Sequence, residues 1–182
     1  MPHLSPEELM ERLRMARDAG KGEHGSSQRV KLQRELAEAC PAFAPNLLYL
    51  ARFLLLSDEP DAEGQDPFAE IQRLLEQAVQ ASDRSAPALV ELAYFHDSIH
   101  NDFKKARGLY EEGAAKALET LEDAWAGLLN SLILEMKLQE ALTLAEHAEK
   151  VFPDSGRIMG AVHEARQAAV AAGLSPPQTV DS

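Results

Sequence analysis

The chain has a single cysteine, few aromatic residues and no long uninterrupted apolar segment. Cys40 cannot form a disulfide within the chain, and no run approaches the ~18 apolar residues needed to span a bilayer. The N-terminal segment MPHLSPEELM has acids where a secretory signal peptide would have basic and then apolar residues. These absences exclude a disulfide framework, and they predict a reducing, cytoplasmic location without membrane insertion.

Basic residues are outnumbered, with 18 Lys and Arg against 30 Asp and Glu, so the net charge is −12. Phosphate binding draws its affinity from Lys and Arg, and we therefore expect no nucleic-acid partner. The charge is uneven, because residues 1–34 hold seven Lys or Arg against five acids, a net of +2 that leaves −14 for the remainder. Two interpretations stay open: solvated helix faces of differing sign, or a basic partner attracted to the acidic body.

The apolar content consists largely of leucine and alanine. Hydrophobic residues make up 45% of the sequence and aromatic residues only 5%, which favours helices over a β-rich core. A chain of 182 residues is long enough for one sizeable domain or a short solenoid. The composition therefore predicts an all-α protein.

The clearest pattern lies between Asp123 and Pro153. Apolar residues follow the i, i+3, i+4, i+7 helical spacing on both sides of Lys137. The first set is Trp125, Leu128, Leu129, Leu132 and Met136, and the second is Leu138, Ala141, Ala145, Ala148 and Phe152. Alanine-sized side chains let two helix backbones approach closely, so we expect an antiparallel hairpin that Pro153 ends.

This stretch resembles the tetratricopeptide repeat, a pattern of ~34 residues with aromatics, a Leu-small pair, A-x3-F and a closing proline. The residues that match in type or spacing are Trp125, Leu128, Leu129, Ala141, Ala145, Ala148 and Pro153. At Leu129 and Leu132 the family usually has a small residue and a Tyr. The resemblance implies a short right-handed α-solenoid of antiparallel helical hairpins with a C-terminal capping helix.

Similar spacing recurs upstream. The predicted segments are a degenerate first hairpin at 5–40, repeats at 43–82, 86–118 and 121–153, a capping helix at 154–172 and a disordered tail at 175–182. They form one domain over 1–174 with about nine helices. Ser5, Asn101-Asp102 and either Asp154 or Ser155 are suited to cap helices. A loop is expected at 18–27, and the returning helix of the third hairpin is expected to contain Phe103, Ala106, Tyr110, Gly113, Ala114 and Ala117.

Two histidines one helical turn apart, His96 and His100, resemble the H-E-x-x-H zinc motif with Asp97 in place of Glu. Asp is shorter than the general-base Glu, no third ligand is evident, and His96 occupies a core-facing position. A packed His96 is therefore favoured, and a metal-dependent hydrolase is kept as the lesser alternative. No cofactor is predicted.

The acidic segment from Glu59 to Gly64, followed by Glu70, imitates the spacing of an EF-hand calcium loop. Glu59 stands where the loop normally begins with Asp, and Asp66 stands where it has a hydrophobic residue. A solvated acidic loop is therefore favoured over a calcium site.

The sequence has no nucleophile elbow, glycine-rich phosphate loop or reactive-cysteine signature, so we expect no enzymatic activity. In stacked hairpins the first helix of each repeat lines a concave surface suited to a peptide or helix. The predicted groove residues are Tyr49, Arg52, Val90, Glu91, Tyr94, Asp97, Asn130 and Ile133. A basic clamp for a terminal carboxylate is not evident.

The predicted function is that of a protein–protein interaction module or adaptor. Its partner would be a peptide or amphipathic helix of another protein, apolar with some basic character. A dedicated chaperone for a secreted or membrane-active protein is an alternative on the same fold. A self-assembling structural subunit, with the basic first hairpin against the acidic body, also stays open, as does the oligomeric state.

Overall fold

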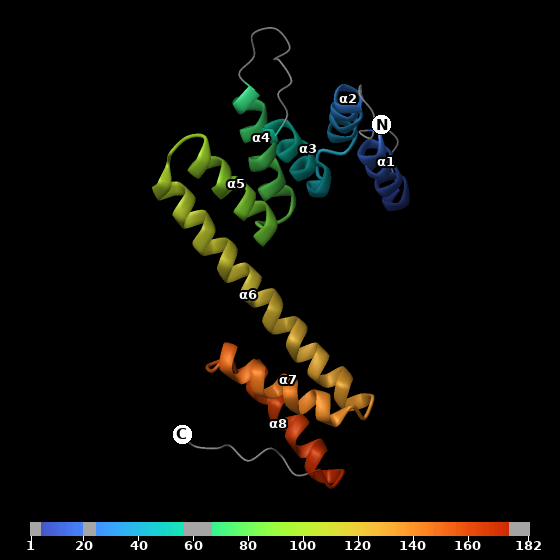
Figure 1. The fold of residues 1–182 in the computed structure, drawn as a ribbon, viewed down its shortest axis with the longest axis vertical. Coiled ribbons are helices and arrows are strands. Elements are labelled where there is room, and N and C mark those ends of the chain that lie inside the picture. The colour runs from blue at the N-terminus through green and yellow to red at the C-terminus, as the bar shows by residue number, and fades with distance from the viewer. Residues whose placement is uncertain (1–4, 20–24, 57–66, 175–182) are drawn as a thin grey trace. The chain divides into compact units, whose positions relative to one another are not determined.

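The computed structural model describes residues 5–19, 25–56 and 67–174, and these fold as helices joined by turns (Figure 1). Within these ranges there are eight helices and no strand, so the fold is all-α as predicted. The helices are α1 (Pro6–Asp18), α2 (Gly25–Ala39), α3 (Ala44–Leu56), α4 (Pro67–Ala81), α5 (Ala86–Ser98), α6 (Phe103–Leu134), α7 (Leu138–Val151) and α8 (Gly156–Ala171). The chain divides into two compact units, Met1–Ala115 and Lys116–Ser182, and α6 runs through both.

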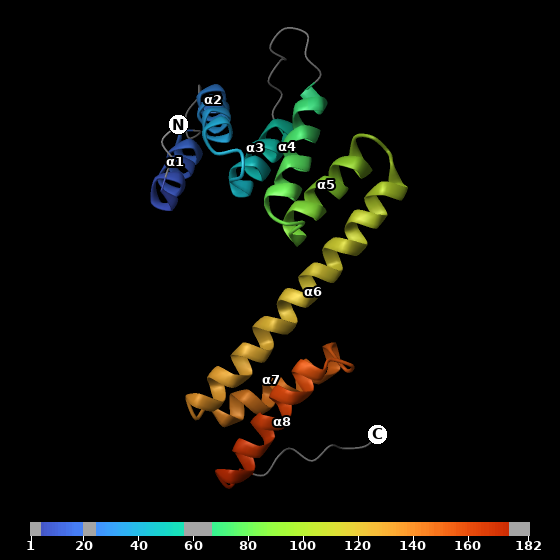
Figure 2. The same ribbon diagram turned by 180° about the vertical axis from the view of Figure 1, so that it is seen from behind.

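The first unit contains α1 to α5 and the beginning of α6. Consecutive helices pack on one another from α1 through α5, as both ribbon views show for α3 and α4 (Figure 2). Alternate helices are also joined, since Arg34 of α2 pairs with Glu70 of α4 at 2.6 Å and Arg52 of α3 pairs with Glu91 of α5. The contacts therefore place second helices beside second helices, and first helices beside first helices.

Large aliphatic side chains fill most of the first core. Its buried members are Val30, Ala44, Leu47, Leu50, Ala51, Ile71, Leu74, Leu75, Ala78, Val79, Ala88, Leu89, Leu92 and Phe95. Phe95 is fully buried. At Gly113 a Cβ would lie 3.1 Å from Val90 Cγ2 and 3.6 Å from the Ala86 carbonyl oxygen. Glycine therefore lets α6 approach α5 closely at this point.

The second unit contains the remainder of α6 with α7 and α8. Its buried cluster consists of Ala126, Leu129, Leu132, Ala141, Ala145, Ala148, Ile158, Ala161, Val162 and Ala165. Trp125 is half-buried at the edge of this cluster, with its ring edge-on to Phe152 at 5.9 Å between centroids. Arg166 of α8 forms two hydrogen bonds with Glu149 of α7. Small side chains thus supply most of the contact between these helices.

Three predicted helix caps are confirmed by their hydrogen bonds. The Ser5 hydroxyl accepts from the Glu8 N–H at 3.2 Å, and the Glu8 carboxylate accepts from the Ser5 N–H. Asp102 accepts from the Lys105 N–H at 3.1 Å. Ser155 accepts from the Ile158 N–H at 3.1 Å, and its hydroxyl also donates to Glu122 of α6. Each cap satisfies an N–H that has no partner within its helix.

The expected break between helices at 103–118 and 121–136 is wrong, because α6 is continuous over 32 residues. Its middle, AAKALETLE at 114–122, has no proline or glycine and consists mostly of strong helix formers. The residues predicted for the returning helix do lie on α6, but residues 114–120 are all exposed, Ala114 and Ala117 among them. Phe103 is 64% exposed. The helix propensity of residues 114–122 therefore outweighs the helix break that the repeat period predicts.

Two large apolar positions of the 123–153 pattern also differ from prediction. Leu128 and Met136 are exposed, and Ala126 is buried instead. Met136 lies in the turn before α7 with a positive φ of 58°, so it leaves the helix rather than continuing its apolar stripe. At the other end of the chain, α2 begins at Gly25, earlier than the predicted loop allows.

Other predictions fall outside the described residues. The acidic segment at 57–66, with the calcium ligands considered from Glu59 to Gly64, is among them. The tail at 175–182 is another. Glu70 is described, and it pairs with Arg34.

Candidate functional site

The first helices of the three hairpins in the first unit, α1, α3 and α5, each carry a stripe of side chains that are exposed or only partly buried. We call these stripes together the first-helix face. They comprise Met10, Arg14 and Arg17 on α1, Tyr49, Arg52, Phe53 and Leu56 on α3, and Val90, Glu91, Tyr94 and Asp97 on α5. The Arg17 guanidinium lies 4.6 Å from the Tyr49 ring centroid, and Arg52 pairs with Glu91. These contacts join α1 to α3 and α3 to α5.

The α5 end of the face is apolar and acidic. Val90 and Tyr94 are 41% and 49% exposed, and Glu91 and Asp97 are partly buried. Tyr110 of α6 lies close enough to Glu91 and Asp97 for their negative charge to affect its ionisation. Burial, and then the proximity of Asp97, Tyr94 and Glu91, raises the pKa of Tyr110 above its ordinary value. A phenol whose pKa is at or above its ordinary value is protonated near neutral pH, so Tyr110 can act as a hydrogen-bond donor there.

Arg52 is paired rather than isolated. Its hydrogen bond to Glu91, and then the charge of that carboxylate, raises the pKa of the Arg52 guanidinium. The two predicted groove residues thus neutralise each other in the middle of the first-helix face. Tyr110, which was not among the predicted groove residues, lies at the same end of the face as Tyr94.

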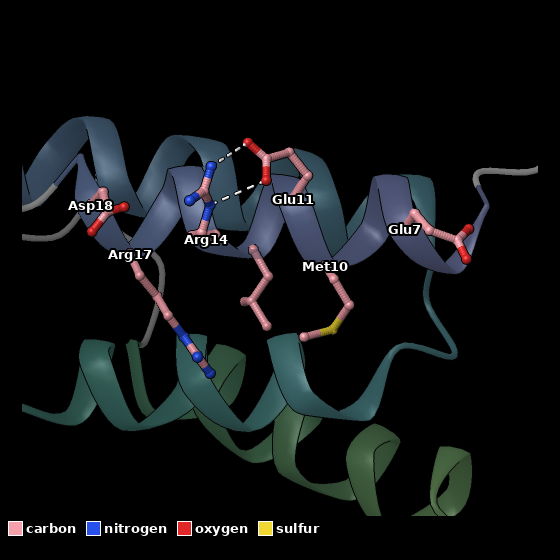
Figure 3. Close-up of a pocket in the computed structure, with 7 residues that line it drawn as sticks. Glu7, Met10, Glu11, Arg14, Arg17 and Asp18 are labelled. Atoms are coloured by element: carbon pink, nitrogen blue, oxygen red, sulfur yellow. Dashed lines mark hydrogen bonds and ion pairs between the residues drawn. The ribbon is translucent and has the colours of Figure 1, made fainter.

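An open cleft of about 420 Å³ runs along α1 at the other end of the face (Figure 3). It is lined by Glu7, Met10, Glu11, Leu13, Arg14, Arg17 and Asp18. Figure 3 shows Met10 and Arg17 pointing to the same side of α1, and Arg14 paired with Glu11 at 2.9 Å. Charges of opposite sign lie near the two ends of the cleft: Glu7 is in the first turn of α1 and Arg17 is in its last turn.

Two arginines stack on aromatic rings beside this cleft. Arg29 of α2 lies 4.9 Å from the Phe53 ring centroid and 6.0 Å from that of Tyr49, while Arg17 covers Tyr49 from α1. The Arg29 guanidinium also donates to the Arg17 carbonyl oxygen at 2.6 Å. We call Arg17, Arg29, Tyr49 and Phe53 the arginine–aromatic cluster. Sequence reasoning did not find it, because its members come from three helices without a shared motif.

The remaining predicted groove residues, Asn130 and Ile133, belong to the second unit. Asn130 is exposed. Ile133 is partly buried against the second core, as Trp125 and Phe152 are. Their part in partner binding stays a prediction.

The predicted packing of His96 is confirmed, since the side chain is 3% exposed and its ring lies 5.9 Å from that of Phe95. Burial, and then the positive charge of Lys105 and the proximity of His100, lowers the pKa of His96. His100 is exposed, with its ring 5.5 Å from His96. Across the ranges that the structure describes, no three His, Cys, Asp or Glu residues are grouped so as to hold a metal ion.

No helix in the described part of the chain is both long and apolar enough to cross a membrane. This finding agrees with the sequence, where charged residues interrupt every apolar stretch. The longest helix, α6, carries Lys, Arg and Glu along its length.

Comparison with known proteins places these helices in a family. Residues 1–83, which contain α1 to α4, match the model of a Myxococcota tetratricopeptide repeat protein family. An uncharacterized 18.1 kDa protein in the carS 3′ region of Myxococcus xanthus is 34% identical over 165 residues, covering 90% of this chain and 95% of that protein. Repeat proteins of this kind usually mediate protein interactions and are generally non-catalytic. The chain belongs to the Myxococcota tetratricopeptide repeat protein family.

Proposed function

We propose that the chain is a cytoplasmic interaction module that binds a peptide or amphipathic helix of another protein along the first-helix face of its first unit. The observation that carries this proposal is the α5 end, where exposed Val90 and Tyr94 lie beside Glu91 and Asp97. Large exposed apolar side chains grouped on one face commonly mark interaction sites. Tyrosine is enriched at binding hot spots, because it offers a wide apolar ring and one hydrogen-bonding group.

The chemistry of this end favours an apolar partner surface with a basic residue. Val90 and the Tyr94 ring can bury apolar side chains, and the Asp97 carboxylate can accept from a Lys or Arg. Glu91 already accepts from Arg52, so a partner cation there would compete with that pair. A helix on the partner would present the apolar residues at i, i+3, i+4 and i+7.

Affinity capture with the full chain as bait tests the proposal. The double variant Tyr94→Ala with Glu91→Lys should reduce capture of the specific partner at least about tenfold, which corresponds to a loss of ~1.4 kcal/mol. The matched control is Phe103→Ala with Glu111→Lys, which removes an exposed aromatic and reverses an exposed acid away from the face. Circular dichroism should show both variants folded.

The results separate the possible roles. Equal capture by the wild type and the Tyr94→Ala, Glu91→Lys variant would refute binding at the first-helix face. A captured partner that is insoluble alone and becomes soluble on co-expression would make the face that of a dedicated chaperone. A partner that is soluble in both conditions would favour an adaptor.

A further inference from the structure

We propose that the arginine–aromatic cluster is a subsite for a side-chain carboxylate of the bound partner. The partner segment would then carry an acidic residue where it meets α1 and a basic residue where it meets α5. This inference rests on the proposed function and specifies the charge pattern of the partner. It assigns a role to Arg17 and Arg29, which lie outside the predicted groove residues.

The stacking leaves the hydrogen-bond donors of the exposed Arg17 available. A guanidinium uses its flat face to contact an aromatic ring, while its N–H groups lie in the plane and point outward from the edge. Arg17 is exposed, and within the described residues neither Arg17 nor Arg29 forms an ion pair with a carboxylate. The ring contacts restrict each arginine side chain, so less side-chain freedom remains to be lost on binding.

A carboxylate is the ligand that suits this geometry. Its two oxygens match the paired N–H groups of a guanidinium edge, and such bidentate bonds are among the stronger hydrogen bonds of proteins. Arg29 is partly buried: its Nε is shielded from solvent and its Nη2 donates to the Arg17 carbonyl oxygen, so it contributes positive charge to the subsite while Arg17 supplies the exposed N–H groups. Reduced contact with water weakens the screening of the Arg29 charge. The cluster is therefore a fixed positive site at the edge of the cleft.

Neighbouring acids limit where the carboxylate can bind. Glu7 and Glu11 line the same cleft nearer the start of α1, and Asp18 follows Arg17. Glu11 is already bonded to Arg14. Glu7 and Glu11 would repel a ligand carboxylate near the start of the cleft, and Arg17 with Arg29 would attract it at the other end, where Asp18 partly offsets the attraction. The acids thus disfavour binding of a carboxylate nearer the start of α1.

The charge of the first-helix face consequently changes from positive to negative along its length. It is positive at Arg17, beside which Arg29 of α2 lies, neutralised in the middle by Arg52 with Glu91, and negative at Asp97. A partner of one sign would be attracted at one end and repelled at the other. Only a segment with charges of both signs complements the whole face, which gives specificity and a preferred register.

Peptide selection tests this inference without requiring the identity of the partner. The full chain serves as bait for random peptides displayed between fixed flanking sequences, so that no peptide has a free terminal carboxylate. Selection is done at low salt, where exposed charges are screened least. We expect the enriched peptides to combine apolar residues at helical spacing with both an acidic and a basic residue.

One enriched peptide is then synthesised with blocked ends, and its affinity is measured by fluorescence anisotropy. Arg17→Gln should weaken binding about tenfold, the effect of losing a charged hydrogen bond. Replacing the acidic residue of the peptide by Gln should weaken binding equally in the wild type, and should have no further effect in Arg17→Gln. Arg12→Gln is the matched control, because Arg12 is exposed on the same helix and does not line the cleft.

The outcomes distinguish this inference from the proposed function. Enriched peptides without acidic residues, or equal affinities for wild type and Arg17→Gln, would overturn the carboxylate subsite while Tyr94→Ala still weakened binding. No enrichment, or enrichment insensitive to Tyr94→Ala, would overturn the proposed function and the subsite with it. Arg17 is the exposed member of the cluster, so its substitution leaves both cores untouched.

Discussion

The two units bury their helices with different side chains. In the first unit, four of the fourteen residues in the buried cluster are alanine, and most others are leucine, isoleucine, valine or phenylalanine. In the second unit, six of the ten are alanine. The first unit therefore packs by interdigitating large side chains, while the second packs by close approach of helix backbones.

This difference shows that helical hairpins of one family can be stabilised by a core of large side chains or by a core of alanines. The two kinds of core are destabilised by different kinds of substitution. A core of large side chains is sensitive to truncation, because a cavity remains where the side chain was. A core of alanines has little to truncate, but it has no room for added methylene groups. Opposite kinds of substitution should therefore have their largest effects in opposite units.

The largest effect is expected from Phe95→Ala in the first unit. Phe95 is fully buried between other members of its cluster, so its removal should lower the free energy of unfolding by about 3–5 kcal/mol. Urea denaturation followed by circular dichroism measures this loss. Leu56→Ala is the control, since Leu56 is 78% exposed and should change stability by less than about 0.5 kcal/mol. A loss below about 1 kcal/mol for Phe95→Ala would contradict the packing described for the first unit.

A smaller effect is expected from Ala145→Leu in the second unit. Ala145 is 1% exposed within the alanine-rich cluster, and overpacking of this kind costs about 1–3 kcal/mol. The same denaturation experiment applies, with Ala117→Leu as the control, because Ala117 is exposed on α6 in the same unit. If both leucine variants were as stable as the wild type, the second core would not be closely packed.

The smallest effect is expected from the titration of His96. Because the fold lowers the pKa of His96 below the value of about 6.5 for the unfolded chain, the unfolded state binds more protons at mildly acidic pH. Stability should therefore be fully present above about pH 6.5, and should fall as the pH decreases toward the lowered pKa.

Thermal melting from neutral to mildly acidic pH checks this dependence, with His96→Gln compared with the exposed control His100→Gln. The wild type and His100→Gln should lose stability below about pH 6.5, and His96→Gln should lose less. His100, Lys105, Asp102 and Glu76 also influence His96, so His100→Gln should shift the dependence slightly without removing it. An unchanged slope in His96→Gln would contradict the assignment.

The sequence predicted those features that depend on neighbouring residues along a helix. Ser5, Asp102 and Ser155 cap helices because capping needs only a polar side chain before an amphipathic run. The burial of His96 followed from its place on the apolar stripe. The tetratricopeptide-like character was likewise evident from the spacing of small and large apolar residues.

Features that depend on tertiary contacts, or on competition between local rules, were not predicted. The continuity of α6 was missed because the repeat period was given more weight than the helix propensity of 114–122. Nothing in the local sequence of Arg17 or Arg29 indicates Tyr49 as a neighbour, because that contact depends on how α1, α2 and α3 pack.

The exposed middle of α6 also determines how cooperatively the chain can unfold. Residues 114–120 are exposed one after another, so their helical state is held mainly by backbone hydrogen bonds and by intrinsic propensity. Any coupling of melting between the two cores through α6 has to pass through these seven residues. A glycine in place of Ala117 would weaken the helix by about 1 kcal/mol without touching a buried side chain. If α6 couples the unfolding of the two cores, Ala117→Gly should replace a single unfolding transition by two.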